Sequence, residues 1–599
     1  IHTKYPIEIN DSILEPPIFS ADSGFYVREF DLILESDEPN AVIFFTLDGS
    51  EPTQDAIKYT SPIKIERQGG NSEGEGPSAM IIRAKVFLEG GYDTSPTISK
   101  TYFIGAIQDF SSNLPVVSFI TDPENLYDPE MGIATDENFR QKGKKWERPI
   151  HIEFFEINGK KEYETDALVR LHGVASRNLP QKSFRIYALD HYEAKESFHY
   201  NFFPGLESAN TGEGLNDFKT LIFRNSGNDW HWTMFRDAFV QELIVHTGLD
   251  TQAYRPVNAF LNGGYWGILN IRERLDGYYV ENHYGIHPDD VIIYEIEHNG
   301  NFYAQDPQSN EFLGFLENIK NSEHPDPKAY QYIEANIDIQ NFIDNQIIYL
   351  YSENRDWKGN NVRFWKKDVS TFIPNLPYGH DGRWRWMVND MDLGFKDASV
   401  DMMPITHHDA EETQLISTLM MYPQFQEQFI NRYADLLNTA FLPERVIDEI
   451  TRFETMLEGD ISKHIARWDT MGGALETWHL NVDQMREFAL MRPGYVRDHI
   501  LQQFQLPGTY LLHTYTKSDQ GFIKINSIDI DESTPGIEDP NAWQGVYFNG
   551  VPITITAIPK AGYRFSHWEG VDFDVMDQST ITFDPDTEIT ITAVFVPSY

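Results

Sequence analysis

Cysteine is absent from the 599 residues of this chain. A chain without thiols has no disulfide, no thiolate nucleophile and no cysteine–zinc site, so other side chains must carry any catalysis or metal binding. Long apolar stretches are also missing. No run of roughly 18 apolar residues occurs, and we therefore expect no membrane-spanning helix.

Basic residues are scarce. Lys and Arg number 48 against 92 Asp and Glu, which gives a formal net charge of −44 at pH 7. Such acidity argues against nucleic acid as a partner, because phosphate backbones bind basic faces. A site for a phosphorylated ligand would have to supply its own local Lys, Arg or metal. The hydrophobic content of 41% is ample for sizeable cores, and the length suggests about four domains.

The stretch from Asp338 to Phe395 organises the middle of the chain. Apolar residues recur at three- and four-residue steps from 339 to 351, which predicts a buried helix capped by Asp338. Two strands are expected at 362–367 and 383–388, joined by a loop rich in Pro and Gly. The helix leads into Asn354-Arg355-Asp356-Trp357-Lys358-Gly359-Asn360-Asn361, and the second strand leads into Asn389-Asp390-Met391-Asp392-Leu393-Gly394-Phe395.

The carboxylates and amides of these two segments suit phosphoryl transfer. That reaction needs a carboxylate to accept a hydroxyl proton and oxygen ligands to hold magnesium against the phosphates. Asp356 and Asn361 keep the spacing of the base and metal ligand in the protein-kinase pattern H-R-D-L-x-x-x-N, and Asp392 begins a D-L-G where D-F-G would stand. Single Asp and Asn residues often only cap helices and turns. The order of helix, motif, hairpin and second motif favours a catalytic site.

A basic turn is expected between strands at 167–171 and 183–189. Glycine permits close backbone approach, and Arg and Lys offer charge-assisted hydrogen bonds, so this turn could fold over phosphates. An exposed loop without that role fits the pattern equally well. The candidate residues for binding a nucleotide here are Gly173, Ser176, Arg177 and Lys182.

Two further candidates lie between the basic turn and the central stretch. A helix is expected from about Trp232 to His246, and its Glu242, with Asp237 as the alternative, could hold a phosphate-binding lysine. A hairpin is expected over 257–272 because Asn262-Gly263 favours a tight turn. Its second strand ends near Glu273, where kinases line the adenine pocket.

Both ends of the chain are predicted to be β-structure. About seven short strands between 13 and 104 indicate a β-sandwich. The run from Phe45 to Thr53 resembles the fibronectin III-like domain at the C-terminus of chitobiase and β-hexosaminidase, a non-catalytic accessory module. After about residue 507, the alternation from Gly550 to Ala557 and the strand-like Ile589 to Phe595 resemble the divergent internalin-type B-repeat of exported bacterial proteins.

The region from about 114 to 504 resembles the kinase family of spore coat protein H (CotH). The motifs behind this resemblance are Lys182-Ser183-Phe184-Arg185, Arg224-Asn225, Arg236-Asp237, the 265–273 hairpin and the acidic motifs at Asp356 and Asp390/Asp392. It implies an atypical, protein-kinase-like α+β domain that uses ATP with Mg²⁺ or Mn²⁺ to phosphorylate Ser or Thr hydroxyls of a protein.

The resemblance also implies roles for individual residues. Asp356 would be the base, Lys182 would contact the nucleotide phosphates, Asn361 and Asp392 would bind metal, and Asp390 would be a second acidic group beside it. Asp390 and Asp392 compete for the main metal role, and the match to D-x-G favours Asp392. The chain departs from ordinary kinases at Asn354, which replaces His, and at Leu393, which replaces Phe. It also lacks a G-x-G-x-x-G loop.

The predicted organisation is a lead-in over 1–12, a fibronectin III-like β-sandwich over 13–106, a CotH-type kinase-like domain over 112–506 and a β-repeat domain over 507–599. The flanking modules indicate a secreted or cell-surface bacterial protein whose signal peptide has been removed, and they could contact the cell surface or glycans. Two alternatives stay open: a catalytically inactive binding or structural protein with a kinase-like core, and a glycan-active enzyme.

Overall fold

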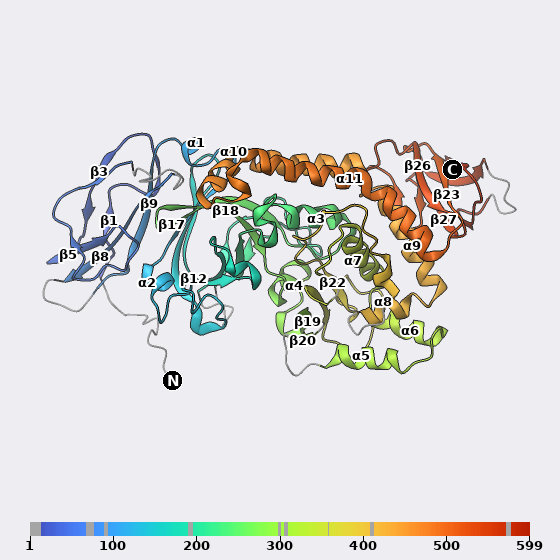
Figure 1. Cartoon of the computed structure of the whole chain (residues 1–599), viewed down its shortest axis with the longest axis horizontal. Helices are drawn as coiled ribbons and strands as arrows, with labels where there is room; N and C mark the ends of the chain where they lie inside the picture. The colour runs from blue at the N-terminus through green and yellow to red at the C-terminus, as the bar shows by residue number, and fades with distance from the viewer. Residues whose placement is uncertain are drawn as a thin grey trace. The chain divides into compact units, whose positions relative to one another are not determined.

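The computed structural model describes residues 14–67, 77–88, 94–189, 196–297, 301–304, 310–357, 359–407, 413–570 and 577–598. The chain forms two compact units (Figure 1). The first consists of Ile1–Met234, Ala253–Arg274 and Glu454–His479, and the second of Phe235–Gln252, Leu275–Phe453 and Leu480–Tyr599. Among the described helices, none has the length and apolarity that crossing a membrane requires.

The N-terminal part of the first unit is built from short strands, as predicted. Its main sheet has five strands in the order β2-β9-β8-β5-β6, and β1 with β4 and β3 with β7 form two-stranded sheets. Leu32, Ile65 and Ile82 are fully buried in its core. The strands are β1 (Ile18–Phe19), β2 (Gly24–Tyr26), β3 (Phe30–Leu32), β4 (Leu34–Glu35), β5 (Ala41–Thr46), β6 (Ile57–Lys58), β7 (Ile63–Ile65), β8 (Met80–Leu88) and β9 (Ile98–Ile104).

The rest of the first unit centres on a closed seven-stranded barrel, in the order β10-β11-β12-β13-β16-β18-β17. Neighbouring strands are antiparallel except β10 and β17, whose parallel pairing closes the barrel. Alternate apolar residues such as Val169, Ile186 and Ile271 fill its interior. The strands are β10 (Val116–Ile120), β11 (Arg148–Phe155), β12 (Lys161–His172), β13 (Ser183–Ala188), β16 (Thr220–Arg224), β17 (Tyr254–Leu261) and β18 (Gly264–Glu273).

Shorter elements complete the first unit. The expected hairpin is confirmed as β17 and β18, with Asn262 and Gly263 at φ 47° and 81° in the turn. A two-stranded sheet pairs β14 (Phe198–His199) with β15 (Asp217–Phe218). The helical segments are α1 (Ile107–Phe110), α2 (Pro123–Tyr127), η1 (Lys144–Trp146), η2 (Ala175–Asn178) and η4 (Gly227–His231).

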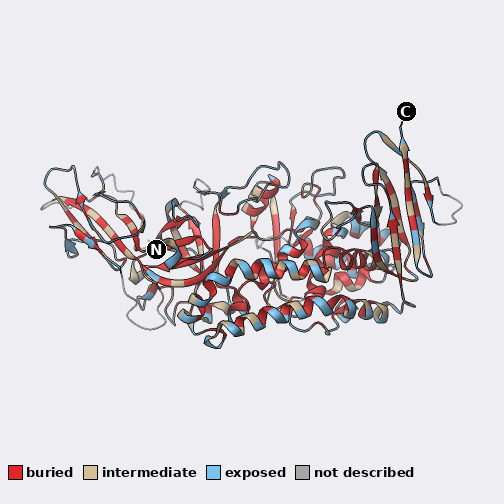
Figure 2. Ribbon diagram, turned by 90° about the horizontal axis from the view of Figure 1, so that it is seen from above, coloured by how far each residue is buried: buried red, intermediate tan, exposed pale blue. Residues whose placement is uncertain are grey.

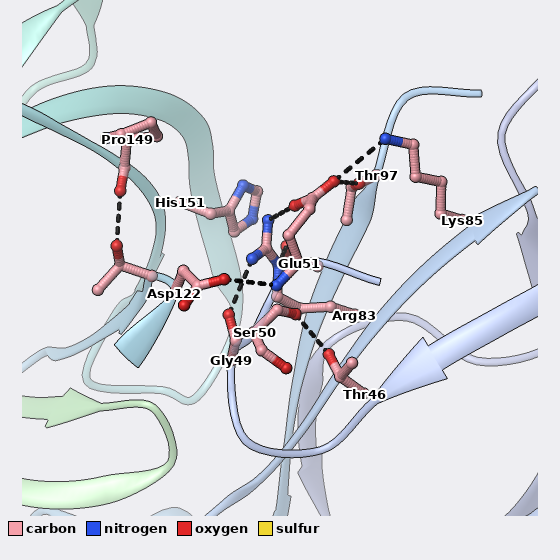
Figure 3. Close-up of polar contacts among 12 residues, drawn as sticks. Thr46, Gly49, Ser50, Glu51, Arg83, Lys85, Thr97, Asp122, Pro149 and His151 are labelled. Carbon is pink, nitrogen blue, oxygen red and sulfur yellow. Dashed lines mark hydrogen bonds and ion pairs between the residues drawn. The ribbon is translucent and has the colours of Figure 1, made fainter. Parts of the chain in front are cut away.

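Aromatic and polar contacts attach the N-terminal strands to the barrel within the first unit. Phe103 of β9 lies 5.0 Å from Phe260 of β17 and 5.6 Å from Phe155 of β11, measured between ring centroids. Figure 3 shows the polar part of this attachment, in which the Glu51 amide donates to Asp122 at 2.9 Å. The Glu51 carboxylate in turn pairs with Arg83 at 2.6 Å.

The second unit contains a four-stranded sheet in the order β20-β19-β21-β22, with α7 (Ile339–Tyr351) packed against β22. The α7 prediction is confirmed, including the cap: the Asp338 carboxylate accepts from the Asn341 amide at 3.3 Å. The Asn341 side chain also bonds both the N–H and the C=O of Trp386 in β22. The strands are β19 (Val291–Glu297), β20 (Asn301–Ala304), β21 (Val362–Lys367) and β22 (Arg385–Met387).

Several helices accompany this sheet. Figure 2 shows buried and exposed residues alternating along the long helices, as expected for amphipathic segments. Two of these helices, α10 and α11, contain residues of both units. The helices are α3 (Arg236–Ile244), η5 (Val245–Thr247), α4 (Gly277–Tyr284), η6 (Pro288–Asp290), α5 (Glu311–Lys320), α6 (Pro327–Asn336), η7 (Met403–His407), α8 (Gln414–Leu419), α9 (Pro423–Leu437), α10 (Pro443–Trp468) and α11 (Leu475–Phe504). Between α10 and α11 in the chain, η9 (Met471–Gly473) belongs to the first unit.

Two sequence-based boundaries need correction. The helix expected from Trp232 begins only at Arg236, because Met234 has φ 72°, a left-handed conformation that a right-handed helix cannot contain. The polar sequence of 296–336 also predicts a mainly helical tract with a loop at 305–310, but strand β20 precedes α5 and α6 there. Most of 305–310 lies outside the described residues.

The C-terminal β-region folds as two four-stranded sheets, β26-β23-β30-β28 and β25-β24-β27-β29. It is anchored to α9 by Asp435, whose carboxylate accepts from the Ser527 hydroxyl at 2.6 Å and the Tyr547 hydroxyl at 2.9 Å. Burial raises the pKa of Asp435 to about 6. The strands are β23 (Thr509–Tyr515), β24 (Gly521–Ile525), β25 (Ile528–Ile530), β26 (Ala542–Phe548), β27 (Ile553–Pro559), β28 (Tyr563–Glu569), β29 (Thr580–Phe583) and β30 (Ile589–Pro597).

Replacing Asp435 should loosen this attachment. Asp435→Ala leaves the buried Tyr547 hydroxyl and the partly buried Ser527 hydroxyl without this acceptor, which should cost about 2–4 kcal/mol of unfolding free energy. Denaturant unfolding measures the loss. Asp519→Ala removes an exposed carboxylate from the same β-region and should change stability by less than about 0.5 kcal/mol. Equal effects of the two substitutions would contradict the anchoring role.

Candidate active site

The end of α7 and the segment after β22 lie against each other in the second unit. The Phe395 amide donates to the Ser352 carbonyl at 2.7 Å, and the Tyr349 hydroxyl bonds both the N–H and the C=O of Asn389. A Cβ on Gly394 would come within 2.9 Å of the Ser352 oxygen, so the glycine of the D-L-G sequence is needed for this close approach. Two motifs separated by the 27 residues from 362 to 388 are thereby brought together.

The Asn354 side chain connects the two motifs directly. Its Nδ2 donates to the Asp390 carbonyl at 3.0 Å, and its Oδ1 accepts from the Asp356 amide at 3.1 Å. Asn354 is 1% exposed, so its end of each hydrogen bond is shielded from water. The residue that stands in place of the kinase histidine therefore has a clear positioning role in this fold.

Asp356 and Asn361 are neighbours, as their spacing predicts. The Asn361 amide donates to the Asp356 carboxylate at 3.2 Å, and the Asn360 amide lies 3.3 Å from both carboxylate oxygens. All three side chains are partly exposed. Trp357, between them in sequence, is buried and stacks on Tyr349 of α7 with ring centroids 5.1 Å apart.

Asp390 and Asp392 occupy the adjoining segment. Asp390 has φ 55° and is partly exposed, whereas Asp392 is only 2% exposed. Between them, the Met391 amide donates to Asp237 of α3 at 2.8 Å. Helix α3 therefore supports the second motif through a buried carboxylate.

Of the two acidic candidates on α3, only Asp237 contacts the motif segments through these hydrogen bonds. Glu242 is about half exposed at its side chain and lies 3.7 Å from the Arg452 guanidinium. Asp237 also accepts from Gln241 at 3.0 Å. The geometry favours the alternative assignment, Asp237, as the α3 residue at this site.

The basic turn of the first unit lies between β12 and β13, as predicted, and contains η2. Gly173 has φ 92°, and a Cβ there would collide with the Ser176 hydroxyl at 2.1 Å. Arg177 is buried and donates to the carbonyls of Leu171, Phe139 and Gln141. Through these hydrogen bonds, Arg177 stabilises the conformation of the turn.

Lys182 closes the same turn. Its ammonium group donates to the carbonyls of Arg177 and Leu179 at 2.6 and 2.9 Å and lies over the Phe139 ring. Burial lowers the pKa of Lys182. A phosphate contact by Lys182 stays a prediction and would require the ammonium group to exchange its carbonyl partners for phosphate oxygens.

Glu273, at the end of β18, is buried and accepts from the Ala253 amide at 3.0 Å. This bond fixes the entry into β17, next to β18 in the barrel. The structure thus gives Glu273 a backbone contact, and its adenine-pocket role stays a prediction.

A cationic row on the outer face of the barrel was missed by sequence reasoning. Arg170 of β12 lies opposite Arg185 of β13 across the strands, and the Arg185 guanidinium donates to the imidazole Nδ1 of His172 at 3.0 Å. In the next two strands, Ile222 of β16 lies opposite Arg185, and Arg272 of β18 lies opposite Ile222. The row therefore crosses four strands, with Ile222 between its arginines. A row of like charges in so acidic a chain is a natural place for an anion.

The pKa shifts of two residues in this row support binding of an anion. Burial, together with Arg274 and Arg170, lowers the pKa of Arg185 to about 10. Burial, together with Arg185, Arg224, Arg177 and Arg274, lowers the pKa of His172 well below its usual range. The cationic forms are thus mutually destabilised, and a bound anion would relieve the repulsion.

The oxygen donors of the second unit suit a hard divalent cation. Asp356, Asn361, Asp390 and Asp392 offer carboxylate and amide oxygens, which Mg²⁺ and Mn²⁺ prefer over softer ligands. The junction of α7 with the segment after β22 holds these four residues on neighbouring stretches of backbone. The donor chemistry therefore fits a magnesium or manganese site.

Comparison with known proteins identifies the family. The model described as CotH kinase protein matches residues 169–496, more than half of the chain, which therefore belongs to this family. The models described as Fn3 associated and Divergent InlB B-repeat domain match residues 32–102 and 541–598. All three resemblances inferred from the sequence are thus confirmed.

Solved structures add a distant similarity. The chain is similar to the proinflammatory kinase CtkA of Helicobacter pylori at 10% sequence identity and a TM-score of 0.20, over 47% of this chain and 91% of that chain. No curated protein matches the chain.

Asn354→Ala should separate the two motifs. The substitution leaves the Asp390 carbonyl and the Asp356 amide without their buried partner, at a cost of about 1–3 kcal/mol. Hydrogen exchange should accelerate at the amide of Asp356 and along 389–392. Asn360→Ala is the matched control, because it removes an amide that contacts the Asp356 carboxylate and leaves the Asn354 bridge in place. Unchanged protection in Asn354→Ala would contradict the bridging role.

Proposed function

We propose that this protein is an exported bacterial kinase that transfers the γ-phosphoryl group of ATP to Ser or Thr hydroxyls of a protein substrate. Membership of the CotH kinase protein family supports a kinase-like function. The observation that carries the proposal is the Asn354 bridge, which joins the segment of Asp356 and Asn361 to that of Asp390 and Asp392. The proposal includes an atypical protein-kinase fold for residues 112–506.

Asp356 is the proposed base. Its carboxylate is oriented by the amides of Asn360 and Asn361 and remains partly exposed, so a substrate hydroxyl could reach it and give up its proton. Asn361, Asp390 and Asp392 are the proposed ligands of Mg²⁺ or Mn²⁺, with Asp392 as the main one. When bound, the metal would neutralise charge on the phosphate oxygens.

The nucleotide phosphates are proposed to bind cationic residues of the first unit. Arg170, His172 and Arg185 form a row in which bound anionic oxygens would relieve mutual repulsion. Lys182 and the turn around Gly173, Ser176 and Arg177 are part of the same proposal. The roles of Glu242 and Glu273 in nucleotide binding rest on the family resemblance, and Asp237 is favoured over Glu242 by its contact with Met391.

A second candidate function is a kinase-like binding protein without catalysis. Two observations favour it. The Lys182 ammonium group donates to the carbonyls of Arg177 and Leu179. The chain also has no G-x-G-x-x-G loop. Nucleotide binding without transfer would support this candidate. The β-modules at 13–106 and 507–599 are proposed to serve at the cell surface or on glycans, since the Fn3-associated and B-repeat matches suit an exported protein.

Asp392→Ala should abolish transfer from γ-labelled ATP, with a loss of at least ~100-fold in rate, since a developing charge would lose its metal-mediated stabilisation. Autoradiography of the protein with candidate substrates measures the effect. Asp397→Ala is the matched control, because it removes an exposed carboxylate five residues further on. Unchanged transfer by Asp392→Ala would rule out the proposed metal ligand, and absence of transfer by the wild-type protein with either metal would favour the binding-protein candidate.

Arg185→Gln should weaken nucleotide binding without lowering the stability of the protein. Without nucleotide, we expect the Tm of the variant to equal or exceed that of the wild-type protein, because a like-charge repulsion is removed. The rise in Tm caused by ATP and Mg²⁺ should shrink. Arg140→Gln removes the same charge from an exposed side chain bonded to Asn178 and should leave the ATP effect intact. An unchanged ATP effect in Arg185→Gln would exclude Arg185 from phosphate binding.

A further inference from the structure

Three potential metal ligands gather on the outer face of the barrel, apart from the residues proposed for catalysis. His151 and Glu153 of β11 and Glu164 of β12 each offer one ligand atom, and these atoms all lie within 4.8 Å of one another. The strand register places Glu153 directly opposite Glu164 and His151 directly opposite Asp166. Two carboxylates facing each other across a ladder repel unless a cation lies between them.

Glu153 is the unusual member of this cluster. Its side chain is 0% exposed, and neither carboxylate oxygen has a hydrogen-bond partner among the described residues. Burying a carboxylate without hydrogen bonds is costly unless a cation compensates it.

His151 has the arrangement of a metal-binding histidine. Its Nδ1 lies 2.8 Å from a carboxylate oxygen of Asp166, while its Nε2 is buried and has no hydrogen-bond partner in the described part of the chain. In metal sites, a carboxylate commonly holds one imidazole nitrogen so that the other nitrogen points at the metal. Figure 3 shows the His151 ring beside Arg83, whose own charge is balanced by Glu51.

Two lysines lie among the carboxylates of this cluster. The Lys161 ammonium group lies 3.9 Å from Glu153, 2.5 Å from Glu164 and 2.8 Å from Asp22, and Lys100 also pairs with Asp22. The four carboxylates of Asp22, Glu153, Glu164 and Asp166 outnumber these two ammonium groups by two charges. A divalent cation would balance that surplus.

We propose that His151, Glu153 and Glu164 bind a divalent transition-metal ion, for which Zn²⁺ is the best fit. One imidazole nitrogen and two carboxylate oxygens form a common zinc ligand set, with water in the fourth position. The metal would take the place of the Lys161 ammonium group beside Glu153. Because Asp22, Ser23 and Thr101 of the N-terminal strands surround the site, the metal would fasten those strands to the barrel.

Isothermal titration of the untagged full chain with ZnCl₂ tests this site, with excess MgCl₂ present to occupy the proposed catalytic metal site. We expect one zinc ion per chain and a rise in Tm. His151→Gln and Glu164→Gln should each weaken binding by more than ~10-fold, because each removes a direct ligand. His513→Gln is the matched control: this histidine lies 3.1 Å from Glu588 on the C-terminal β-region and should not affect the titration.

Two further variants distinguish a built site from a mere acidic surface. Asp166→Ala should weaken zinc binding by ~10–100-fold, because it removes the partner of His151 Nδ1 while the three ligands remain. Lys161→Gln should strengthen binding, because the competing ammonium group is gone. Absence of zinc binding by the wild-type protein, or binding that survives both His151→Gln and Glu164→Gln, would overturn the proposal. Neither result depends on kinase activity.

Discussion

The junction between the end of α7 and the segment after β22 is the constraint on which the candidate active site depends. The backbone leaves α7 at Ser352 and returns to it at Phe395, and the buried Asn354 amide bridges the two passes. A glycine is required at 394 because the two backbone segments approach so closely there that a Cβ would meet the Ser352 oxygen. The buried Asp237 carboxylate supports the same junction from α3. Side chains positioned by such shielded hydrogen bonds need little rearrangement before they bind a metal, and this preorganisation favours a catalytic role.

Acidic and basic side chains occupy different ends of the outer face of the seven-stranded barrel. Strand β12 carries Glu164 and Asp166 near its beginning and Arg170 and His172 near its end, and alternation puts all four on the same face. The acidic end includes the buried Glu153 carboxylate, whose oxygens have no hydrogen-bond partner among the described residues, and this favours a bound cation. At the basic end, burial and neighbouring arginines lower the pKa of Arg185, and this favours a bound anion. A strongly acidic chain can therefore offer a local site to phosphates without changing its overall charge.

Local patterns in the sequence predicted what local forces determine. The periodicity of 339–351, the cap at Asp338 and the Asn262-Gly263 turn each act within a few residues, and the helix and hairpin formed as expected. Closure of the barrel depends on the pairing of β10 with β17, which are remote in sequence, and has no local pattern. The same holds for Arg170 and Arg185, which become neighbours only through strand register. Likewise, spacing alone could not choose Asp237 over Glu242, because that choice depends on the position of Met391.

The central claim is that the junction of α7 and the segment after β22 binds the metal of a phosphoryl-transfer site. Anomalous diffraction at the manganese edge, from crystals grown with Mn²⁺ and a non-hydrolysable ATP analogue, tests it most directly. We expect a manganese peak coordinated by the Asn361 side chain and the Asp392 carboxylate, with a phosphate oxygen of the analogue in the same coordination shell. Manganese and nucleotide bound elsewhere, with Asn361 and Asp392 still contacting only protein, would contradict the claim.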